Sequence, residues 1–190
     1  QALPVFHVGG LSIETGASLS GSMVKEGLRD EEKWDPQFFV DATIAAKGTF
    51  SALVPTQVYD LVEKNLQAPP SLRAVVVGGA SLSQDIYERA IALGWPLLPS
   101  YGMTECCSQV ATASPAGWRK GERDLVLLSH IEVQTAPEGF LKIRSPALFT
   151  GVAQWRGGRS FWEDPKVDGW FQTEDVVEVR GRVLAPIGRG

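Results

Sequence analysis

The sequence predicts an α/β fold in which a parallel-sheet βαβ part is followed by an antiparallel, β-barrel-like part. Two patterns carry this prediction. Up to about residue 115, short apolar runs alternate with segments of helical spacing; beyond it, the runs alternate apolar and polar residues with period two. We therefore expect two parts, residues 1–115 and residues 116–190.

The first predicted helix begins at Asp35 and Pro36. An Asp side chain accepts hydrogen bonds from first-turn N–H groups, and Pro at the first helical position loses no bond. Apolar residues then recur at helical spacing until Gly48, which is typical of a helix end. A strand over residues 50–54 and a helix over residues 56–65 are expected to follow.

A βαβ unit is predicted next. The strand over residues 73–77 contains three successive valines, which is typical of a strand buried on both faces of a parallel sheet. A helix over residues 83–93 leads to a second strand over residues 96–100, and a single-helix connection makes the two strands parallel. Tyr101 and Gly102 are expected to end the second strand.

The second part is predicted to be antiparallel. Period-two alternation marks three strands, over residues 131–135, 140–144 and 176–180. Turn signals at Gly139 and Gly181 separate such runs. This part is therefore expected to form a barrel or a small sandwich.

Composition and charge exclude several functional classes. The chain has 18 Lys and Arg residues against 22 Asp and Glu residues, a net charge of −4, with no concentrated basic segment. Phosphate neutralisation supplies most of the affinity of a nucleic-acid binder, so nucleic acid is not expected as a partner. No apolar run approaches the roughly 18 residues needed to span a membrane. No signal peptide is visible, and we expect a cytoplasmic protein without a membrane partner.

The only two cysteines, Cys106 and Cys107, are adjacent. Neighbouring cysteines rarely bridge each other, and their use fits a reducing compartment. Both are expected to be small packing residues rather than nucleophiles.

The carboxyl ends of the two βαβ strands are the expected ligand site, because ligands of open parallel sheets bind there. Residues 78–80 follow the first strand and residues 100–105 the second. Glycines let a flat ring or a phosphate approach the backbone, and Tyr101 offers an aromatic face. Thr104 beside Glu105 suits a phosphate with Mg²⁺. The alternative is a turn with a capping Thr and a solvated Glu.

Five segments resemble, in order, motifs of the adenylate-forming superfamily of acyl-CoA synthetases, luciferases and peptide-synthetase adenylation domains. They are FHVGGL (6–11), similar to the aromatic-His segment of the acyl pocket; VVVGGA (75–80), similar to the adenine-side loop; SYGMTE (100–105), similar to Tyr-Gly-x-Thr-Glu; EGFLKIRSP (138–146); and DGWFQTEDVVEVRGRVLAPIGRG (168–190), similar to Gly-Trp-Phe-x-Thr-x-Asp and the hinge approach. The resemblance covers essentially the whole chain. It implies a fragment of the large N-terminal domain of an acyl-CoA synthetase.

Within that superfamily, YGMTECCSQVAT and FHVGGLSI are most similar to the o-succinylbenzoate–CoA ligases of menaquinone biosynthesis. The resemblance implies adenylation of a small-molecule carboxylic acid by ATP, with Mg²⁺, followed by acyl transfer to CoA. Two alternatives stay open. One is a ligase or adenylation domain for another aryl, fatty or amino acid; the other is a non-catalytic nucleotide-binding module of the same fold.

The resemblance also implies residue roles. Thr104 would bind the α-phosphate, Glu105 would hold Mg²⁺, and His7 would assist the substrate carboxylate, so these three are the expected catalytic residues. The expected nucleotide-binding residues are Gly78, Gly79, Ala80, Ser100, Tyr101, Gly102, Thr104, Asp175 and Arg189. The expected substrate-binding residues are His7, Gly79, Met103 and Ser108. The alternatives are a β-turn role for Asp175, a frayed Arg189, and a His7 merely packed beside Phe6.

Two parts of the family pattern are not found in the 190 residues: the Ser/Thr/Gly-rich phosphate loop, expected upstream, and the C-terminal domain with its lysine. We therefore expect a piece of a longer protein that completes neither half-reaction alone. Apolar faces that the upstream part would cover are expected to be exposed and to allow copies to associate.

Overall fold

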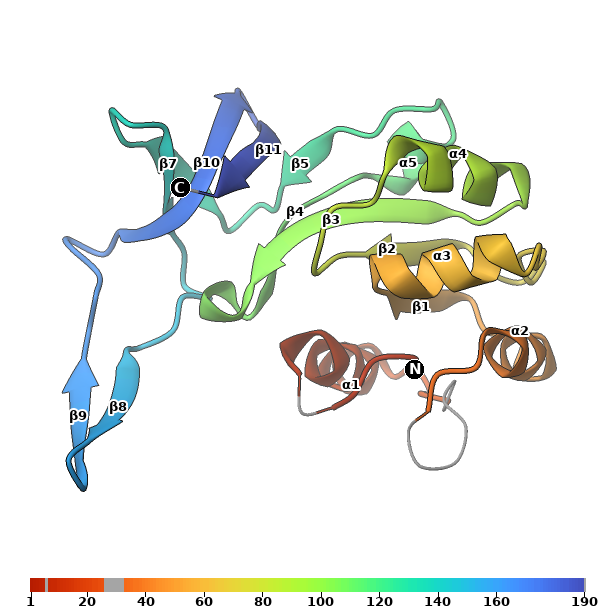
Figure 1. The fold of residues 1–190 in the computed structure, drawn as a ribbon, viewed down its shortest axis with the longest axis horizontal. Helices are drawn as coiled ribbons and strands as arrows, with labels where there is room; N and C mark the ends of the chain where they lie inside the picture. The colour runs from red at the N-terminus through yellow and green to blue at the C-terminus, as the bar shows by residue number, and fades with distance from the viewer. Residues whose placement is uncertain (6, 26–32, 190) are drawn as a thin grey trace.

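The computed structural model describes residues 1–5, 7–25 and 33–189. Figure 1 shows one long twisted sheet with helices near its parallel end and a separate hairpin at the other end. The helical elements are α1 (Val8–Ser20), α2 (Pro36–Ala45), α3 (Pro55–Glu63), α4 (Gln84–Ala92), the 3₁₀ turn η2 (Thr104–Cys106) and α5 (Pro115–Trp118). The strands are β1 (Phe50–Leu53), β2 (Ala74–Val77), β3 (Leu97–Met103), β4 (Ser108–Thr112), β5 (Leu125–Leu127), β6 (Glu132–Thr135), β7 (Phe140–Arg144), β8 (Val152–Arg156), β9 (Arg159–Glu163), β10 (Phe171–Arg180) and β11 (Val183–Arg189).

The parallel half confirms the predicted βαβ unit. The nine-stranded sheet has the order β1-β2-β3-β4-β5-β11-β10-β7-β6, and β1, β2 and β3 are parallel. Helix α4 connects β2 to β3. Helix α2 begins as predicted: the Asp35 carboxylate accepts a hydrogen bond from the N–H of Phe38 at 3.0 Å, and Pro36 occupies the first turn.

One face of the parallel strands carries the first hydrophobic core. Val75 and Leu97 are neighbours across β2 and β3 and are fully buried. Helices α3 and α4 cover them with side chains that include Leu61 and Ala90. Trp95 is fully buried in this core, and its indole N–H donates to the Leu66 carbonyl at 2.8 Å. Helices α3 and α4 therefore each place an apolar face against this core.

Strand β3 does not end at Tyr101 and Gly102, so that prediction is wrong. It continues to Met103, pairing with β2 on one edge and with the antiparallel β4 on the other. The register of β3 and β4 shifts between Tyr101 and Gly102. A Cβ on Gly102 would lie 1.7 Å from the Ser108 carbonyl oxygen. This glycine thus permits a close approach inside the ladder instead of breaking the strand.

The second half is antiparallel, as predicted. Strands β6 and β7 form a hairpin, β10 pairs with both β7 and β11, and the side chains between them form a second hydrophobic core. Its fully buried members include Val110, Leu141, Ile143 and Leu184. Over the described ranges the strands extend the parallel sheet and do not close into a barrel.

Several elements were not predicted: α1, η2, α5 and the strands β4, β5, β8, β9 and β11. Helix α1 contains three glycines among its 13 residues, and this low helix propensity hid it in the sequence pattern. Hairpin β8–β9 projects away from the rest of the molecule (Figure 1). Its Trp155 and Trp162 are 74% and 64% exposed. Within the described ranges, no helix has both the length and the apolar character needed to cross a bilayer.

Candidate nucleotide and acyl site

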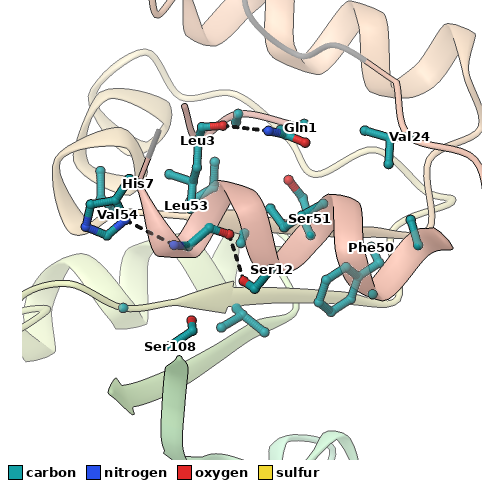
Figure 2. Close-up of a pocket in the computed structure, with 18 of the residues that line it drawn as sticks. Gln1, Leu3, His7, Ser12, Val24, Phe50, Ser51, Leu53, Val54 and Ser108 are labelled. Carbon is teal, nitrogen blue, oxygen red and sulfur yellow. Dashed lines mark hydrogen bonds between the residues drawn. The ribbon is translucent and has the colours of Figure 1, made fainter. Parts of the chain in front are cut away.

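A cavity of about 1310 Å³ lies at the carboxyl ends of the parallel strands, against α1. Figure 2 shows side chains from α1, β1 and the start of β4 around it. Many of the predicted site residues line it: His7, Gly78, Gly79, Ser100, Gly102, Met103, Thr104, Glu105, Ser108 and Arg189. Ala80, Tyr101 and Asp175 are not among its lining residues. Segments more than 180 residues apart in the chain therefore meet at one cavity.

Thr104 and Glu105 lie on the tight turn that reverses the chain between β3 and β4. The turn η2 closes when the N–H of Cys107 donates to the Thr104 carbonyl at 3.1 Å, with Cys107 at φ 51°. The Glu105 carbonyl accepts a hydrogen bond from the N–H of Phe149 at 2.9 Å. The backbone of this turn is thus held from both sides while the two side chains face the cavity.

The two cysteines beside this turn differ. Cys106 is buried in the second core, and burial, with Glu105 and Cys107 nearby, raises its pKa to about 12. A thiol with that pKa is neutral and packs as a small apolar group, as predicted. Cys107 is exposed, so the expectation that it also packs is wrong.

Asp175 lies where two hydrogen-bond donors reach its carboxylate. The Tyr101 hydroxyl donates to Oδ2 at 2.6 Å, and Arg189 Nε donates to Oδ1 at 3.1 Å. The N–H of Asp175 donates to the Thr173 hydroxyl at 3.1 Å. Burial, then the hydrogen bond to Asp175, raises the pKa of Tyr101 well above its usual range. Tyr101 is therefore a permanent donor, and the carboxylate that it orients is only 19% exposed.

Ser100 belongs to a polar cluster that the sequence did not reveal. The Gln109 amide nitrogen donates to Ser100 Oγ at 3.1 Å and to Thr112 Oγ1 at 2.7 Å, and the two hydroxyls are 3.0 Å apart. Ser100 lies on β3, whereas the other two lie on β4. The register shift between β3 and β4 brings these three side chains together. In the sequence, the only indication of this cluster was a polar residue within a predicted strand.

His7 is the N-cap of α1. Its Nδ1 accepts a hydrogen bond from the N–H of Gly9 at 3.1 Å. A neutral His7 ring with Nδ1 as acceptor carries its proton on Nε2, which is then a donor. The ring is exposed and lines the cavity. The alternative in which it packs beside Phe6 concerns a residue outside the described ranges.

The loop after β2 comes close to β3. A Cβ on Gly78 would lie 3.4 Å from the Ser100 carbonyl oxygen, and Gly79 has φ 89°, a conformation that favours glycine. Gly78 and Gly79 line the cavity, while Ala80 is exposed beside it. Gly78 and Gly79 therefore form a part of the cavity wall that has no side chains, called the glycine wall below.

Lys166 anchors the segment that supports the Thr104–Glu105 turn. Its ammonium donates to the carbonyl of Phe149 at 2.8 Å and to that of Thr150 at 3.3 Å, and pairs with Asp164 at 2.7 Å. The Phe149 ring packs edge-on against Phe171 of β10, with centroids 5.0 Å apart. Phe149 thus connects the turn that carries Glu105 to the strand that carries Asp175.

The number of carboxylates at the cavity fits a metal ion that is bound partly by a ligand, rather than one that is held by protein side chains alone. Among the described residues, no three His, Cys, Asp or Glu side chains are close enough to hold a metal together. Glu105 lines the cavity beside the hydroxyl of Thr104. Mg²⁺ commonly binds through one or two carboxylates and completes its shell with phosphate oxygens and water. The residues present therefore fit Mg²⁺ that arrives with a polyphosphate.

Comparisons with known proteins identify the family of the chain. The family described as "AMP-binding enzyme" matches residues 1–134. The 2-succinylbenzoate–CoA ligase of Staphylococcus epidermidis is 31% identical over 186 residues, which are 94% of this chain and 38% of the relative. This chain thus spans about two fifths of the length of the curated relatives that it matches.

Solved structures are similar over nearly the whole chain. O-succinylbenzoate coenzyme A synthetase (MenE) from Bacillus subtilis, in complex with AMP, superposes with a TM-score of 0.81 at 22% identity, over 99% of this chain and 40% of that one. E. coli MenE with a bound phenylether-linked analogue of OSB-AMS gives a TM-score of 0.76 at 29% identity, over 98% and 38%. At 22% identity, the similarity to the Bacillus subtilis structure is a similarity of fold alone. Both superpositions include the parallel half and the antiparallel half of this chain.

Proposed function

The chain belongs to the family of AMP-binding enzymes, and from this premise we propose that it carries the nucleotide and acyl sites of an ATP-dependent acid–CoA ligase, with o-succinylbenzoate as the acid. The observation that carries the proposal is the meeting of Thr104, Glu105 and Arg189 at one cavity, with Asp175 bound to Arg189. Similarity to 2-succinylbenzoate–CoA ligases supports the choice of acid.

The proposed reaction has two halves. In the first, an oxygen of the substrate carboxylate attacks the α-phosphorus of ATP, and the bond to pyrophosphate breaks. In the second, the CoA thiol attacks the acyl carbon and AMP leaves. The task of the protein is to position the reactants and to stabilise the charge that develops on the phosphoryl oxygens.

Each residue has a role that its position supports. Thr104 donates its hydroxyl hydrogen bond to an α-phosphate oxygen, and Glu105 supplies the carboxylate that holds Mg²⁺. When bound, Mg²⁺ neutralises phosphate charge. Asp175 accepts hydrogen bonds from the ribose hydroxyls, and its orientation by Tyr101 at 2.6 Å supports this role. Arg189 reaches the same ribose.

The acyl end of the proposed site is formed by α1 and the glycine wall. His7 donates from Nε2 to the substrate carboxylate, which is compatible with Nδ1 accepting from the N–H of Gly9. Gly79, Met103 and Ser108 line the path of the acyl group, and Gly78, Ala80, Ser100 and Gly102 flank the adenine. We further propose that the chain consists of two parts, residues 1–115 and 116–190, and that the protein is cytoplasmic. Copies of the chain associate through exposed apolar faces.

Calorimetric titration of the chain tests the proposal. The ligands are a non-hydrolysable o-succinylbenzoyl-adenylate analogue and an AMP analogue. We expect the acyl-adenylate analogue to bind more tightly, and Thr104→Val and Asp175→Ala to weaken both ligands by about tenfold, the effect of one charge-assisted hydrogen bond. Equal binding of the two ligands would discard the named acid. No binding to a folded chain would contradict the assignment of the site.

A further inference from the structure

A buried glutamine lies between two walls of the cavity. Gln57, in the first turn of α3, is only 8% exposed and lines the cavity. Its side-chain oxygen accepts a hydrogen bond from the N–H of Val54 at 3.0 Å, and its side-chain nitrogen donates to the Ala2 carbonyl at 2.9 Å. One amide group therefore joins the segment before α1 to the residue that follows β1.

These two backbone partners require an amide side chain between them. A backbone N–H only donates and a carbonyl only accepts, so the bridging group must carry both an acceptor and a donor. The bond to the Val54 N–H serves the start of α3, because Val54 is the N-cap of that helix. Ala2 lies outside the described helices and strands, so the bond to its carbonyl has a different role.

The segment at Ala2 leads directly to His7. Ala2 is 1% exposed and belongs to the first hydrophobic core. Two residues further on, the Pro4 carbonyl accepts a hydrogen bond from the N–H of His7 at 3.2 Å. A Cβ on Gly10 would lie 2.1 Å from the same carbonyl oxygen, so the start of α1 packs directly on this segment. A shift of Ala2 would therefore move the N-cap of α1, which is His7.

The other end of the bridge reaches the glycine wall. A Cβ on Gly79 would lie 3.7 Å from Val54 Cγ1, so the residue that Gln57 holds is in contact with this wall. Figure 2 shows both Val54 and His7 among the residues around the cavity. Gln57 therefore links the wall on one side of the cavity to the segment that carries His7 on the other.

From this buried bridge we infer that Gln57 is a positioning residue for His7. This role rests on the proposed function, in which His7 Nε2 donates to the reacting carboxylate. Gln57 acts through the backbone: it holds the segment before His7 at the distance from Gly79 at which that donor meets the acyl group. A donor that is positioned in advance lowers the ordering cost of binding and improves the alignment of the reacting group.

A double-mutant cycle by calorimetry tests this role. The proteins are the unmodified chain, Gln57→Met, His7→Ala and the double variant. The ligands are the non-hydrolysable o-succinylbenzoyl-adenylate analogue, which has the acyl carbonyl that His7 would reach, and the AMP analogue, which lacks it. We expect Gln57→Met to weaken the first ligand by about fivefold and the second by less than about twofold. In the His7→Ala background, Gln57→Met should cause no further loss.

Two further variants separate positioning from stability. Gln57→Glu keeps an acceptor for the Val54 N–H but has no donor for Ala2 when ionised, so it should weaken the acyl-adenylate analogue as Gln57→Met does. If Gln57→Met does not fold, Gln57→Glu carries the same test. Gln37→Met is the matched control: the Gln37 amide donates to Asp41 at 3.0 Å, but Gln37 is exposed and does not line the cavity. This variant should change neither affinity.

A spectroscopic measurement on His7 needs no ligand. In the unmodified chain, Nδ1 accepts from the N–H of Gly9, which favours the tautomer with its proton on Nε2. Nitrogen NMR of the ring should show a smaller population of this tautomer in Gln57→Met, and an unchanged population in Gln37→Met.

Three results would overturn the positioning role. Gln57→Met could weaken both ligands equally, or neither; it could cause the same loss with and without His7; or it could leave the His7 tautomer unchanged. A different result concerns the proposed function: if the unmodified chain binds both ligands equally, the acyl part of that function fails. The His7 tautomer then decides by itself whether Gln57 positions the ring.

Discussion

The hydroxyl of Tyr101 donates a 2.6 Å hydrogen bond to the carboxylate of Asp175, although 74 residues separate them in the chain. Tyr101 belongs to β3 and Asp175 to β10, so the bond joins two strands that are not neighbours in the sheet. Arg189 holds the other carboxylate oxygen. The carboxylate is thereby held in place without a ligand, and for the proposed ribose contact this lowers the ordering cost of binding.

Tyr101→Phe should therefore weaken binding of an AMP analogue. Removal of the donor leaves the Asp175 carboxylate held by Arg189 alone, and hydrogen bonds to charged groups are worth about 1.5–3 kcal/mol. We expect affinity to fall by about tenfold or more by calorimetry. Tyr59→Phe, at an exposed tyrosine of α3, is the control and should bind normally. Unchanged affinity in Tyr101→Phe would show that the phenol does not position Asp175.

Stability should decline in alkaline solution partly because of Cys106. Burial raises its pKa from a value near 9 to about 12. The unfolded chain therefore loses this proton before the folded chain does, so the contribution is complete below pH 9 and is lost as pH rises toward 12. The limiting slope is about 1.4 kcal/mol per pH unit.

Urea unfolding at pH 8 and pH 10.5 checks this prediction. Cys106→Ala should show a smaller loss of unfolding free energy between the two pH values than the unmodified chain. Cys107→Ala is the matched control, because this neighbouring thiol is exposed. The same pH dependence in all three proteins would contradict the assignment to Cys106.

Gly102→Ala should destabilise the fold strongly. A Cβ at this position would lie 1.7 Å from the backbone oxygen of Ser108, so β3 and β4 would have to separate locally. We expect a loss of about 2–4 kcal/mol, comparable to other core distortions. In contrast, Gly16→Ala in α1 meets nothing within 4 Å and should raise stability slightly. Thermal unfolding of both variants measures the difference, and similar melting temperatures would contradict the prediction.

Lys166→Met should loosen the Thr104–Glu105 turn without touching it. The variant loses two hydrogen bonds to the carbonyls of Phe149 and Thr150, and Phe149 in turn donates to the Glu105 carbonyl. Amide exchange of Phe149 should become faster, and binding of an AMP analogue should weaken by several-fold. Lys166→Arg should restore part of both effects. Lys120→Met, at an exposed lysine, should change neither.

Local patterns predicted the parallel half well, because its strands and helices follow one another along the chain. The Asp35 cap and the valine-rich strand β2 formed as expected, but β2 is buried on one face only: Val75 and Val77 are buried, whereas Val76 on the other face lines the cavity. Local patterns failed at Gly102, where a residue that usually breaks strands is required by a contact with Ser108. The missed interaction is non-local, and the sequence has no periodic signal for it.

The candidate site was predicted as separate loops rather than as a network. The residues of the turn after β3 and of the segment near Asp175 were identified, but their connections were not. Thr173, Gln109 and Phe149 are hydrogen-bonded to Asp175, Ser100 and Glu105, respectively, and Lys166 is hydrogen-bonded to Phe149. Such supporting residues depend on register and on side-chain direction, which the sequence pattern alone does not specify.

Strand β3 has a thermodynamic consequence for the whole chain. Its first residues pair in parallel with β2, and its last residues pair with the antiparallel β4 and lead into the Thr104–Glu105 turn. Neither half can therefore melt without losing hydrogen bonds to a strand that the other half also uses. A ligand held by either half should raise the melting temperature of both, and unfolding should follow a single cooperative transition.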